Sequence, residues 1–441
     1  MTYTRESFAT FRVLPWTVDG ATLTLRFSLD DRIEFVETLG FPTAVDVARP
    51  GVLAAIDLLA AVAGVSYFKV ASPHRIALEG EPLTADGMHL LCRLYDDGLR
   101  EYAYRNELPV PFETIMENAG RERPATLPMR PKPFRGNILL PMGGGRDSGL
   151  LASLLRHRDP TLMSVGENSY VARLAFELQL RYFVVTRSIS PNITELNRGE
   201  AMNGHIPVTA INSLVAIVAA LLTDHDTVVM ANESSASSPT ITLRNGCEIN
   251  HQFSKSFEVE LSMNAALKAA KIPVDYFSAV RPYGELAIAK AFATKSELFP
   301  LIMSCNRAFV RDPAQRSNGW CGRCAKCRFV FLTLAPFTTP KQLKAMFGRD
   351  LLNSADGWDA AGFAALLLED RPFDCVGEVS EVRLAIGLLA ASPEWSNHPG
   401  VLSLVELAPP LDRVKLAQSL APQPEHNVPA EILADVAIAF T

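Results

Sequence analysis

A glycine-rich segment near the middle of the chain has the composition of an anion-binding loop. Residues 137–151 read NILLPMGGGRDSGLL, so a short apolar strand leads into three glycines and then into Arg146, Asp147 and Ser148. Glycine lets the backbone turn sharply and bring its N–H groups close to an anion. The helix expected over 149–156 would point the positive end of its dipole at the same place. The segment therefore predicts a phosphate site, although it lacks the spacing and the lysine of a Walker A loop.

The order of residues in this loop resembles S-G-G-x-D-S, the PP-loop motif of ATP pyrophosphatases, which cleave ATP between the α- and β-phosphates. The six positions are occupied by Gly143, Gly144, Gly145, Arg146, Asp147 and Ser148. The resemblance implies that the glycines and Ser148 hold the phosphates, with Gly143 in place of the first serine. Asp147 is expected either to cap the helix or to bind Mg²⁺, and Arg146 either to be solvated or to reach the phosphates. A glycine-rich turn without a ligand is the alternative interpretation.

Four cysteines in the second half of the chain have the spacing of a metal site. Cys321, Cys324 and Cys327 form a C-x-x-C-x-x-C pattern, with Cys305 upstream. A Cys₄ set binds zinc tetrahedrally and leaves no position open for substrate, so a structural Zn²⁺ is predicted. An iron–sulfur cluster and unligated thiols are the alternatives. The other cysteines are scattered and are interpreted as ordinary core or surface residues: Cys92, Cys247 and Cys375.

A second polar segment follows an apolar, strand-like stretch. Asn232, Glu233 and Ser234 come directly after the expected strand at 227–231. In an open α/β sheet, ligands bind outside the carboxyl ends of the strands, so these residues are candidates for the nucleotide site. Ordinary turn chemistry is the alternative.

Candidates for a proton-transferring base are more numerous than the sequence can rank. Residues 250–256 read NHQFSKS, and within them His251 and Lys255 are the first choice because their segment should approach the same strand ends. Both are equally compatible with surface positions. Other residues of suitable chemistry are His205, Tyr283, Lys69 and Tyr67.

The elements around these segments predict three regions, of which the first is an N-terminal α+β domain over 1–130. It opens with β-type alternation at 22–27 and 32–36, followed by an apolar helix at 51–64 and a strand-like stretch at 65–70. A linker is predicted by Pro124, Pro128, Pro131 and Pro133.

The second region, 136–335, alternates between strands and helices, which favours a doubly wound parallel sheet with an α/β fold. The expected strands are 138–140, 161–165, 182–187 and 227–231, and the expected helices are 149–157, 168–180, 209–222 and about 255–270. The glycine loop follows the first strand, where such a sheet binds ligands. The third region, 336–441, is predominantly helical in pattern, as at 358–368 and 380–389.

The composition of the 441-residue chain narrows the class of protein. A formal net charge of −6 and a pI near 5.8 argue against a nucleic-acid-binding surface. The longest apolar run, 214–222, is too short to span a bilayer, and no segment has the layout of a signal peptide. A cytoplasmic protein without a membrane or nucleic-acid partner is expected, and its oligomeric state stays open.

Segments spread over nearly the whole chain resemble the MurL family of peptidoglycan glutamate epimerases. They are FSLDDRIEFVETLGFP at 27–42, AGVSYFKVASP at 63–73, MANESSASS at 230–238, SCNRAF at 304–309 and FDCVGEVSEVR at 373–383. The central region, with its glycine loop and cysteines, is also similar to the shorter nitrile-forming synthase of deazaguanine biosynthesis. Both resemblances imply a PP-loop, HUP-like fold. They also imply an enzyme that splits ATP to AMP and pyrophosphate.

The MurL resemblance implies an isomerase of peptidoglycan precursor synthesis, and thus of cell wall biogenesis, cell shape and cell division. Its reaction is the conversion of UDP-N-acetylmuramoyl-L-alanyl-L-glutamate to the D-glutamate form with ATP and Mg²⁺. An acyl-adenylate would make the α-proton of the glutamate more acidic. The residues expected to be catalytic in this reaction are Asp147, Ser148, His251 and Lys255. Another adenylating enzyme, whether amidating, nitrile-forming or thiolating, and a non-catalytic nucleotide sensor are the alternatives.

Overall fold

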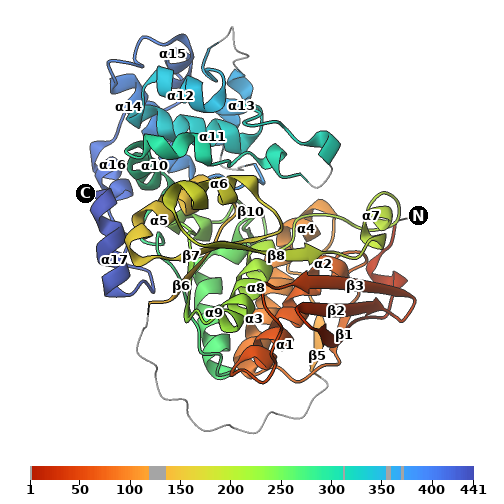
Figure 1. Ribbon diagram of the computed structural model, residues 1–441. Coiled ribbons are helices and arrows are strands. Elements are labelled where there is room, and N and C mark those ends of the chain that lie inside the picture. Colours follow the sequence, from red (N-terminus) through yellow and green to blue (C-terminus); the bar gives the residue numbers. More distant parts are fainter. Residues whose placement is uncertain (1, 119–135, 311–312, 354–358, 369–371) are drawn as a thin grey trace.

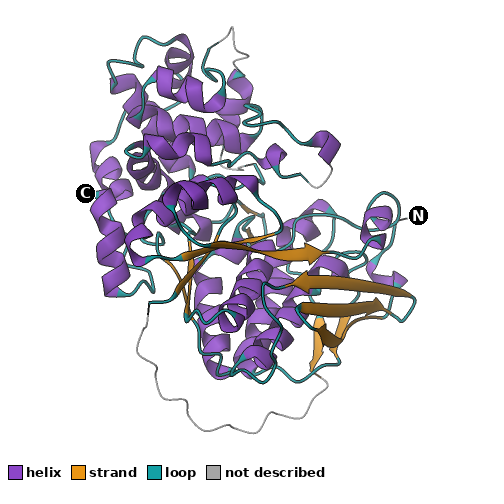
Figure 2. Cartoon of the chain, in the orientation of Figure 1, coloured by secondary structure: helices purple, strands orange, loops and turns teal. Residues whose placement is uncertain are grey.

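A ten-stranded sheet with helices on both of its faces forms the frame of the molecule (Figure 1; Figure 2). The computed structural model describes residues 2–118, 136–310, 313–353, 359–368 and 372–441. In spatial order the strands are β12 (Asp275–Ser278), β9 (Thr227–Met230), β6 (Ile138–Pro141), β7 (Thr161–Val165), β8 (Tyr182–Ser188), β3 (Ile33–Gly40), β2 (Thr22–Leu29), β1 (Thr10–Asp19), β4 (Arg75–Leu78) and β5 (Ile115–Asn118). The predicted α/β class with a mostly parallel sheet is confirmed.

The five strands from β12 to β8 run parallel and contain a reversal of strand order. Along the chain, β6, β7 and β8 are added in one direction, whereas β9 and β12 lie on the other side of β6. The reversal falls between β6 and β9, which pair directly through Leu139 and Val228. Ligands of such sheets bind in the crevice outside this point. The glycine loop and the Asn232–Ser234 segment are the two loops that leave it.

Successive residues of the parallel strands point to opposite faces and enter two separate hydrophobic cores. In β6, for example, Leu139 belongs to one core, while Leu140 belongs to the other. The first core is covered by α8 (Val208–Leu222) and α9 (Phe257–Ala269), and the second by α5 (Arg146–Leu154), α6 (Ser169–Leu178) and α10 (Glu285–Ala293). Burial on both faces explains why β6 and β9, in the middle of the parallel half, are almost continuously apolar. The observed bounds lie within a few residues of the predicted ones.

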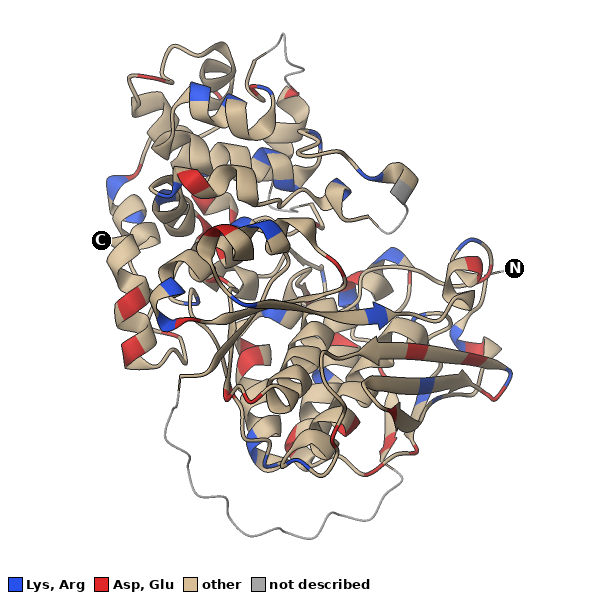
Figure 3. Ribbon diagram, in the orientation of Figure 1, with Lys and Arg blue, Asp and Glu red and all other residues tan. Residues whose placement is uncertain are grey.

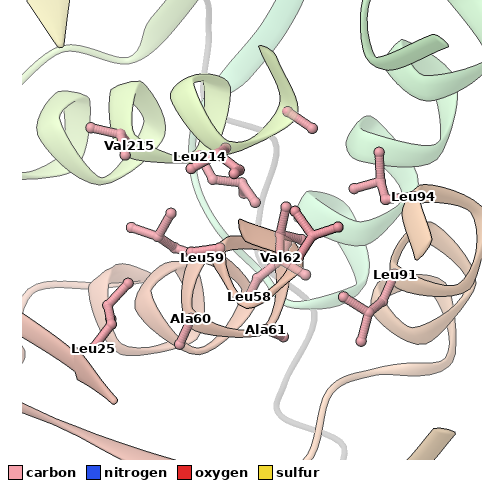
Figure 4. Close-up of a cluster of buried hydrophobic side chains, with 14 of the residues drawn as sticks. Leu25, Leu58, Leu59, Ala60, Ala61, Val62, Leu91, Leu94, Leu214 and Val215 are labelled. Carbon is pink, nitrogen blue, oxygen red and sulfur yellow. The ribbon is translucent and has the colours of Figure 1, made fainter. Parts of the chain in front are cut away.

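The N-terminal strands extend the same sheet. β3 pairs antiparallel with β8, so the sheet runs without a break from the parallel half into the N-terminal meander. α1 (Val52–Ala63) packs against α8, and Figure 4 shows its leucines facing Leu214 and Val215 in one shared core. The boundaries predicted for three domains stay predictions. The prolines predicted to form the linker lie outside the described residues.

The strand-like interpretation of residues 65–70 is wrong. Val65–Phe68 form a short helix, α2, and the preceding Gly64 has helical angles (φ −52°, ψ −27°), so the chain continues almost directly from α1. Every side chain of this stretch is buried. A short, fully buried apolar run has no period that separates strand from helix, which is why the sequence pattern misled.

The C-terminal region is helical, as predicted, and returns to the parallel half of the sheet. Its helices are α11 (Ala325–Leu334), α12 (Pro340–Phe347), α13 (Ala360–Ala364), α14 (Val379–Ala391), α15 (Pro399–Val405), α16 (Arg413–Leu420) and α17 (Ala430–Ala437). At the chain end, Phe440 stacks on Tyr283 with ring centroids 3.6 Å apart, and Asp435 of α17 pairs with Arg158. The last helix therefore lies against the element that begins with the glycine loop.

Charged residues of both signs alternate along the helices and loops of both halves (Figure 3). No helix in the described part of the chain has the length and apolarity needed to cross a membrane. The absence of a nucleic-acid partner stays a prediction.

A buried ion pair joins the two halves of the sheet and gives a test of their coupling. Glu37 of β3 is fully buried and accepts two hydrogen bonds from Arg187 of β8, at 2.7 and 3.3 Å, and one from the Tyr67 hydroxyl at 2.8 Å. Glu37→Ala should lower the free energy of unfolding by roughly 3–5 kcal/mol, because it leaves a mostly buried guanidinium without its partner.

Urea unfolding of Glu37→Ala beside Glu34→Ala is the measurement. Glu34 is also on β3, but its side chain is 60% exposed and its pair with Arg26 is loose at 3.5 Å, so its loss should cost roughly 0–1 kcal/mol. Equal, small losses in both variants would show that Glu37 does not couple the halves.

Candidate active site

Two loops leave the carboxyl ends of β6 and β9 and lie side by side at the reversal of strand order. The first is 142–145, which leads from β6 into α5, and the second is 231–234, which follows β9. The structure thus brings together the two segments that the sequence singled out for a nucleotide.

The glycine loop is held open by contacts to its carbonyl groups. The amide of Asn168 donates to the Gly143 carbonyl at 3.1 Å, and the Met303 N–H donates to the Gly144 carbonyl at 2.7 Å. Gly144 has φ +82°, and a Cβ there would lie 3.1 Å from Asn168, so this position requires glycine. Among the described residues, the N–H groups of Gly143, Gly144 and Gly145 have no hydrogen-bond acceptor. Three donors are therefore available to an anion.

α5 begins at the end of this loop, with Gly145 as its N-cap. Arg146 N–H donates to Ser304 Oγ at 3.0 Å, and the Ser148 hydroxyl donates to the Gly145 carbonyl at 3.2 Å. The side chain of Asp147 accepts from Arg146 Nε at 2.8 Å and does not cap the helix. Its carboxylate lies in the first turn, where the positive end of the helix dipole favours a negative charge.

The guanidinium of Arg146 lies in a buried network. Its side chain is 1% exposed and pairs with Glu285, the first residue of α10, whose side chain is equally buried. Lys326 of α11 donates to the other oxygen of Glu285 at 3.2 Å. Arg146 is therefore not solvated. Burial raises the pKa of Asp147, but the charges of Arg146 and Lys326 outweigh burial and hold that pKa below its usual range.

The loop after β9 is fixed by two polar side chains. Ser278 at the end of β12 accepts from the Asn232 N–H and donates to the Asn232 carbonyl, both at 2.7 Å. Arg281 donates to the Glu233 carbonyl at 2.7 Å, and both Asn232 and Glu233 are buried. Ser234 is partly exposed and lines a cavity of about 890 Å³ between the 234–238 turn, α14 and α16.

His251 and Lys255 approach a residue to which sequence reasoning assigned no role. Lys255 Nζ donates to Cys375 Sγ at 3.4 Å, and the His251 imidazole lies near the same sulfur, where it lowers the pKa of the thiol. Arg281 also donates to the Lys255 carbonyl at 2.7 Å, which ties this segment to the Glu233 loop. The only signal in the sequence was the position of Cys375 within the segment 373–383.

His251 and His205 form a tilted ring pair in which the two pKa values shift in opposite directions. Their rings lie 4.2 Å apart, and Glu101 accepts a hydrogen bond from His251 Nδ1. Burial lowers the pKa of His251, but its hydrogen bonds to Cys375 and Glu101 raise it to about 9. Burial, together with the neighbouring charge on His251, lowers the pKa of His205 to about 4.

The other candidate bases are committed to structural contacts. The Tyr67 hydroxyl donates to Glu37 in the N-terminal core, the ring of Tyr283 is stacked on Phe440, and Lys69 bonds to Asn203. Only Tyr283 among these three touches either loop, through its backbone carbonyl, which accepts from the Ser234 N–H at 3.0 Å.

The four predicted metal ligands converge. Their sulfur atoms all lie within 4.8 Å of one another, with Cys305 and Cys327 buried and Cys321 and Cys324 partly buried. Backbone N–H groups donate to the sulfurs within the turns, from Cys324 to Cys321 at 3.3 Å and from Cys327 to Cys324 at 3.4 Å. Donors of this kind stabilise thiolates. The set fits a closed tetrahedral zinc site in which no position is left for substrate.

Comparison with known proteins places this geometry in a family. The MurL N-terminal domain matches residues 2–279, and the MurL C-terminal domain matches residues 301–419. No solved structure is similar enough to this chain to be matched.

Several relatives are named UDP-N-acetyl-alpha-D-muramoyl-L-alanyl-L-glutamate epimerase. The one from Micromonospora sp. is 39% identical over 91% of this chain and 90% of its own length. That of Xanthomonas oryzae pv. oryzae is 36% identical over 97% and 96%, and that of Salinispora tropica is 40% identical over 80% and 77%. The chain belongs to the MurL family and is an isomerase.

Proposed function

We propose that this protein inverts the terminal L-glutamate of UDP-MurNAc-L-Ala-L-Glu to D-glutamate, through an acyl-adenylate formed from ATP. The names of its relatives support the substrate and the inversion. The observation that supports the use of ATP is the pair of loops at the strand-order reversal, one of which offers three free N–H groups at the start of a helix.

The adenylate supplies what an epimerisation at a free carboxylic acid lacks. Removal of the α-proton from a carboxylate would give an enediolate with two negative charges, so the proton is a very weak acid. Joining AMP to the carboxylate removes one charge and makes the carbonyl strongly electron-withdrawing. A side-chain base can then remove the proton. Hydrolysis of the adenylate releases AMP and the product.

The glycine loop is suited to the β- and γ-phosphates that leave as pyrophosphate. The N–H groups of Gly143, Gly144 and Gly145 and the hydroxyl of Ser148 surround the start of α5, where the helix dipole attracts an anion. Arg146 contributes indirectly, because its guanidinium is held by Glu285 and its backbone anchors the loop to Ser304.

The two remaining parts of the nucleotide site are a carboxylate and the neighbouring loop. Asp147 is charged and partly exposed, so it is the residue that would hold Mg²⁺, which neutralises phosphate charge when bound. Asn232, Glu233 and Ser234 lie in the neighbouring loop after β9, where the backbone groups and the partly exposed Ser234 are suited to the ribose or the adenylate.

Zinc at the four cysteines would act structurally. The turns that carry Cys321 and Cys324 lead directly into α11, which also supplies Lys326 to the buried network. Zinc would therefore fix the start of α11 relative to the glycine loop without touching substrate.

The first prediction concerns the nucleotide products. With UDP-MurNAc-L-Ala-L-Glu, ATP and Mg²⁺, the protein should form AMP, pyrophosphate and the D-glutamate product, because the loop lacks the Walker lysine. Nucleotide chromatography and chiral analysis of the glutamate measure this. ADP as the main product would contradict the adenylate, and AMP with an amidated L-glutamate would indicate the amidating alternative.

The second prediction tests the loop. Ser148→Ala or Asp147→Ala should slow AMP formation by about 10²-fold or more, because each removes a group that meets developing phosphate charge. The matched control is Ser153→Ala, which makes the same change one to two turns further along α5. Equal rates for Ser148→Ala and Ser153→Ala would show that the Ser148 hydroxyl does not act on ATP.

The third prediction concerns the metal. Freshly purified protein should contain about one zinc per chain, measured by elemental mass spectrometry. Cys324→Ser should lose that zinc and unfold at a lower temperature, because a structural site contributes folding free energy directly. Cys247→Ser, outside the cluster, should retain both. Protein that contains neither zinc nor iron would exclude the site.

A further inference from the structure

A cysteine, a lysine and a histidine from distant parts of the chain meet at the edge of the nucleotide site. Lys255 Nζ lies 3.4 Å from Cys375 Sγ and 3.2 Å from Gln252 Oε1, and the His251 imidazole lies near the Cys375 sulfur and acts on its charge state. Gln252 Nε2 donates to the Val376 carbonyl at 3.5 Å. These contacts hold the turn before α9 against the segment that carries the cysteine.

Cations surround the sulfur and favour its thiolate form. Burial raises the pKa of Cys375, but the charges of Lys255 and His251, the hydrogen bond from His251 and the charge of Lys326 outweigh burial and lower the pKa to about 6. Cys92 of the same chain shows the opposite shift. Burial raises its pKa, and no cation among the residues that the structure describes acts on it to lower the pKa again. Thiolates, not thiols, act as bases and nucleophiles.

Acidic groups around the cluster raise the pKa values of Lys255 and His251 and so favour their charged forms. Burial lowers the pKa of Lys255, but Cys375 and Glu233 raise it, so the lysine stays charged. Glu101 acts in the same way on His251. Asp374 also lies nearby, and its pKa is raised by burial.

Lys326 links this cluster to the glycine loop. Its ammonium group donates to Glu285, which pairs with Arg146, and its charge lowers the pKa of both Asp147 and Cys375. Arg281 adds a direct link, because it donates to the carbonyls of both Lys255 and Glu233 at 2.7 Å and so ties the cluster to the loop after β9. A base beside this loop is suited to act on the carbon next to the activated carboxyl group.

We propose that the thiolate of Cys375, held by Lys255 and His251, is the base that removes the α-proton of the glutamate. This inference rests on the proposed epimerisation through an adenylate. Lys255 and His251 are then positioning residues, which keep the sulfur charged and oriented, and the earlier expectation that one of them is the base gives way to Cys375.

The step balances in protons and electrons. The Cα–H bond breaks as an S–H bond forms, and the electron pair of the Cα–H bond moves into the activated carbonyl to give an enolate. Water on the opposite face then protonates Cα, and the hydroxide that remains takes the proton from the Cys375 thiol. The thiolate is regenerated, and the configuration at Cα is inverted.

The test compares Cys375→Ala and Cys375→Ser with the wild type and with Cys92→Ser, a cysteine on α3 (Ala85–Asp96) away from the cluster. Each protein is incubated in heavy water with UDP-MurNAc-L-Ala-L-Glu, ATP and Mg²⁺. AMP, D-glutamate and deuterium at Cα are measured in the same sample.

The Cys375 variants should lose D-glutamate and Cα deuterium together by roughly 10²- to 10⁴-fold, the contribution of a positioned base. They should still release AMP, because adenylation and hydrolysis do not use the thiolate. Cys92→Ser should behave as the wild type. D-glutamate formed by Cys375→Ala at the wild-type rate would overturn the proposal, whereas a wild type that makes D-glutamate without AMP would overturn the adenylate instead.

A second measurement separates a chemical role from a structural one. Alkylation of Cys375 by iodoacetamide, followed by peptide mass spectrometry, reports the thiolate from about pH 4 to pH 9. The midpoint should lie near pH 6 in the wild type and in Lys255→Arg, and should rise in Lys255→Gln, since removal of the cation raises the pKa. The low-pH limit of D-glutamate formation should rise with it. A midpoint that Lys255→Gln leaves unchanged would contradict the proposed role of the lysine.

Discussion

The buried pair between Arg146 and Glu285 is the constraint on which the site depends. A charge inside a protein is tolerated only when a partner and hydrogen bonds satisfy it, and both side chains are 1% exposed. Arg146 follows the glycine loop, Glu285 begins α10, and Lys326 in the first turn of α11 completes the network. Three helix starts therefore converge because their charges must pair. The position of the anion-binding loop relative to the C-terminal region follows from that pairing.

The same electrostatic logic extends outward from this pair. Lys326 donates to Glu285 and also lowers the pKa of Cys375. Glu233 raises the pKa of Lys255, and Glu101 raises that of His251. The positive groups thus remain charged in a partly buried site, and they in turn stabilise the thiolate. Each of these charges depends on its neighbours, because burial alone would favour the protonated cysteine and the neutral histidine.

The sequence was sufficient to predict those parts of the candidate site that depend on local patterns of residues. The glycine loop, the strand–helix alternation after residue 136 and the four cysteines depend on neighbours within a few residues, and the structure shows these elements where they were expected. Cys375 and Lys255 are 120 positions apart, and only folding reveals that they touch. The antiparallel pairing of β3 with β8 and the burial of Arg146 depend likewise on distant partners. Where even a local pattern failed, at 65–68, full burial had erased the difference between the helical and strand periods.

Contacts around Cys375 also join the C-terminal region to the first half of the chain. The two MurL domain matches divide between residues 279 and 301. Lys255, His251 and the glycine loop fall in the first match, whereas Cys375, Lys326 and the four clustered cysteines fall in the second. The first part has the glycine loop and two of the cations that lower the pKa of Cys375, and the second has the cysteine itself and the third cation, Lys326. The contact of Gln252 with Val376 holds the two parts of the proposed site together, and Glu285, which lies between the two matches, joins Arg146 of the first part to Lys326 of the second.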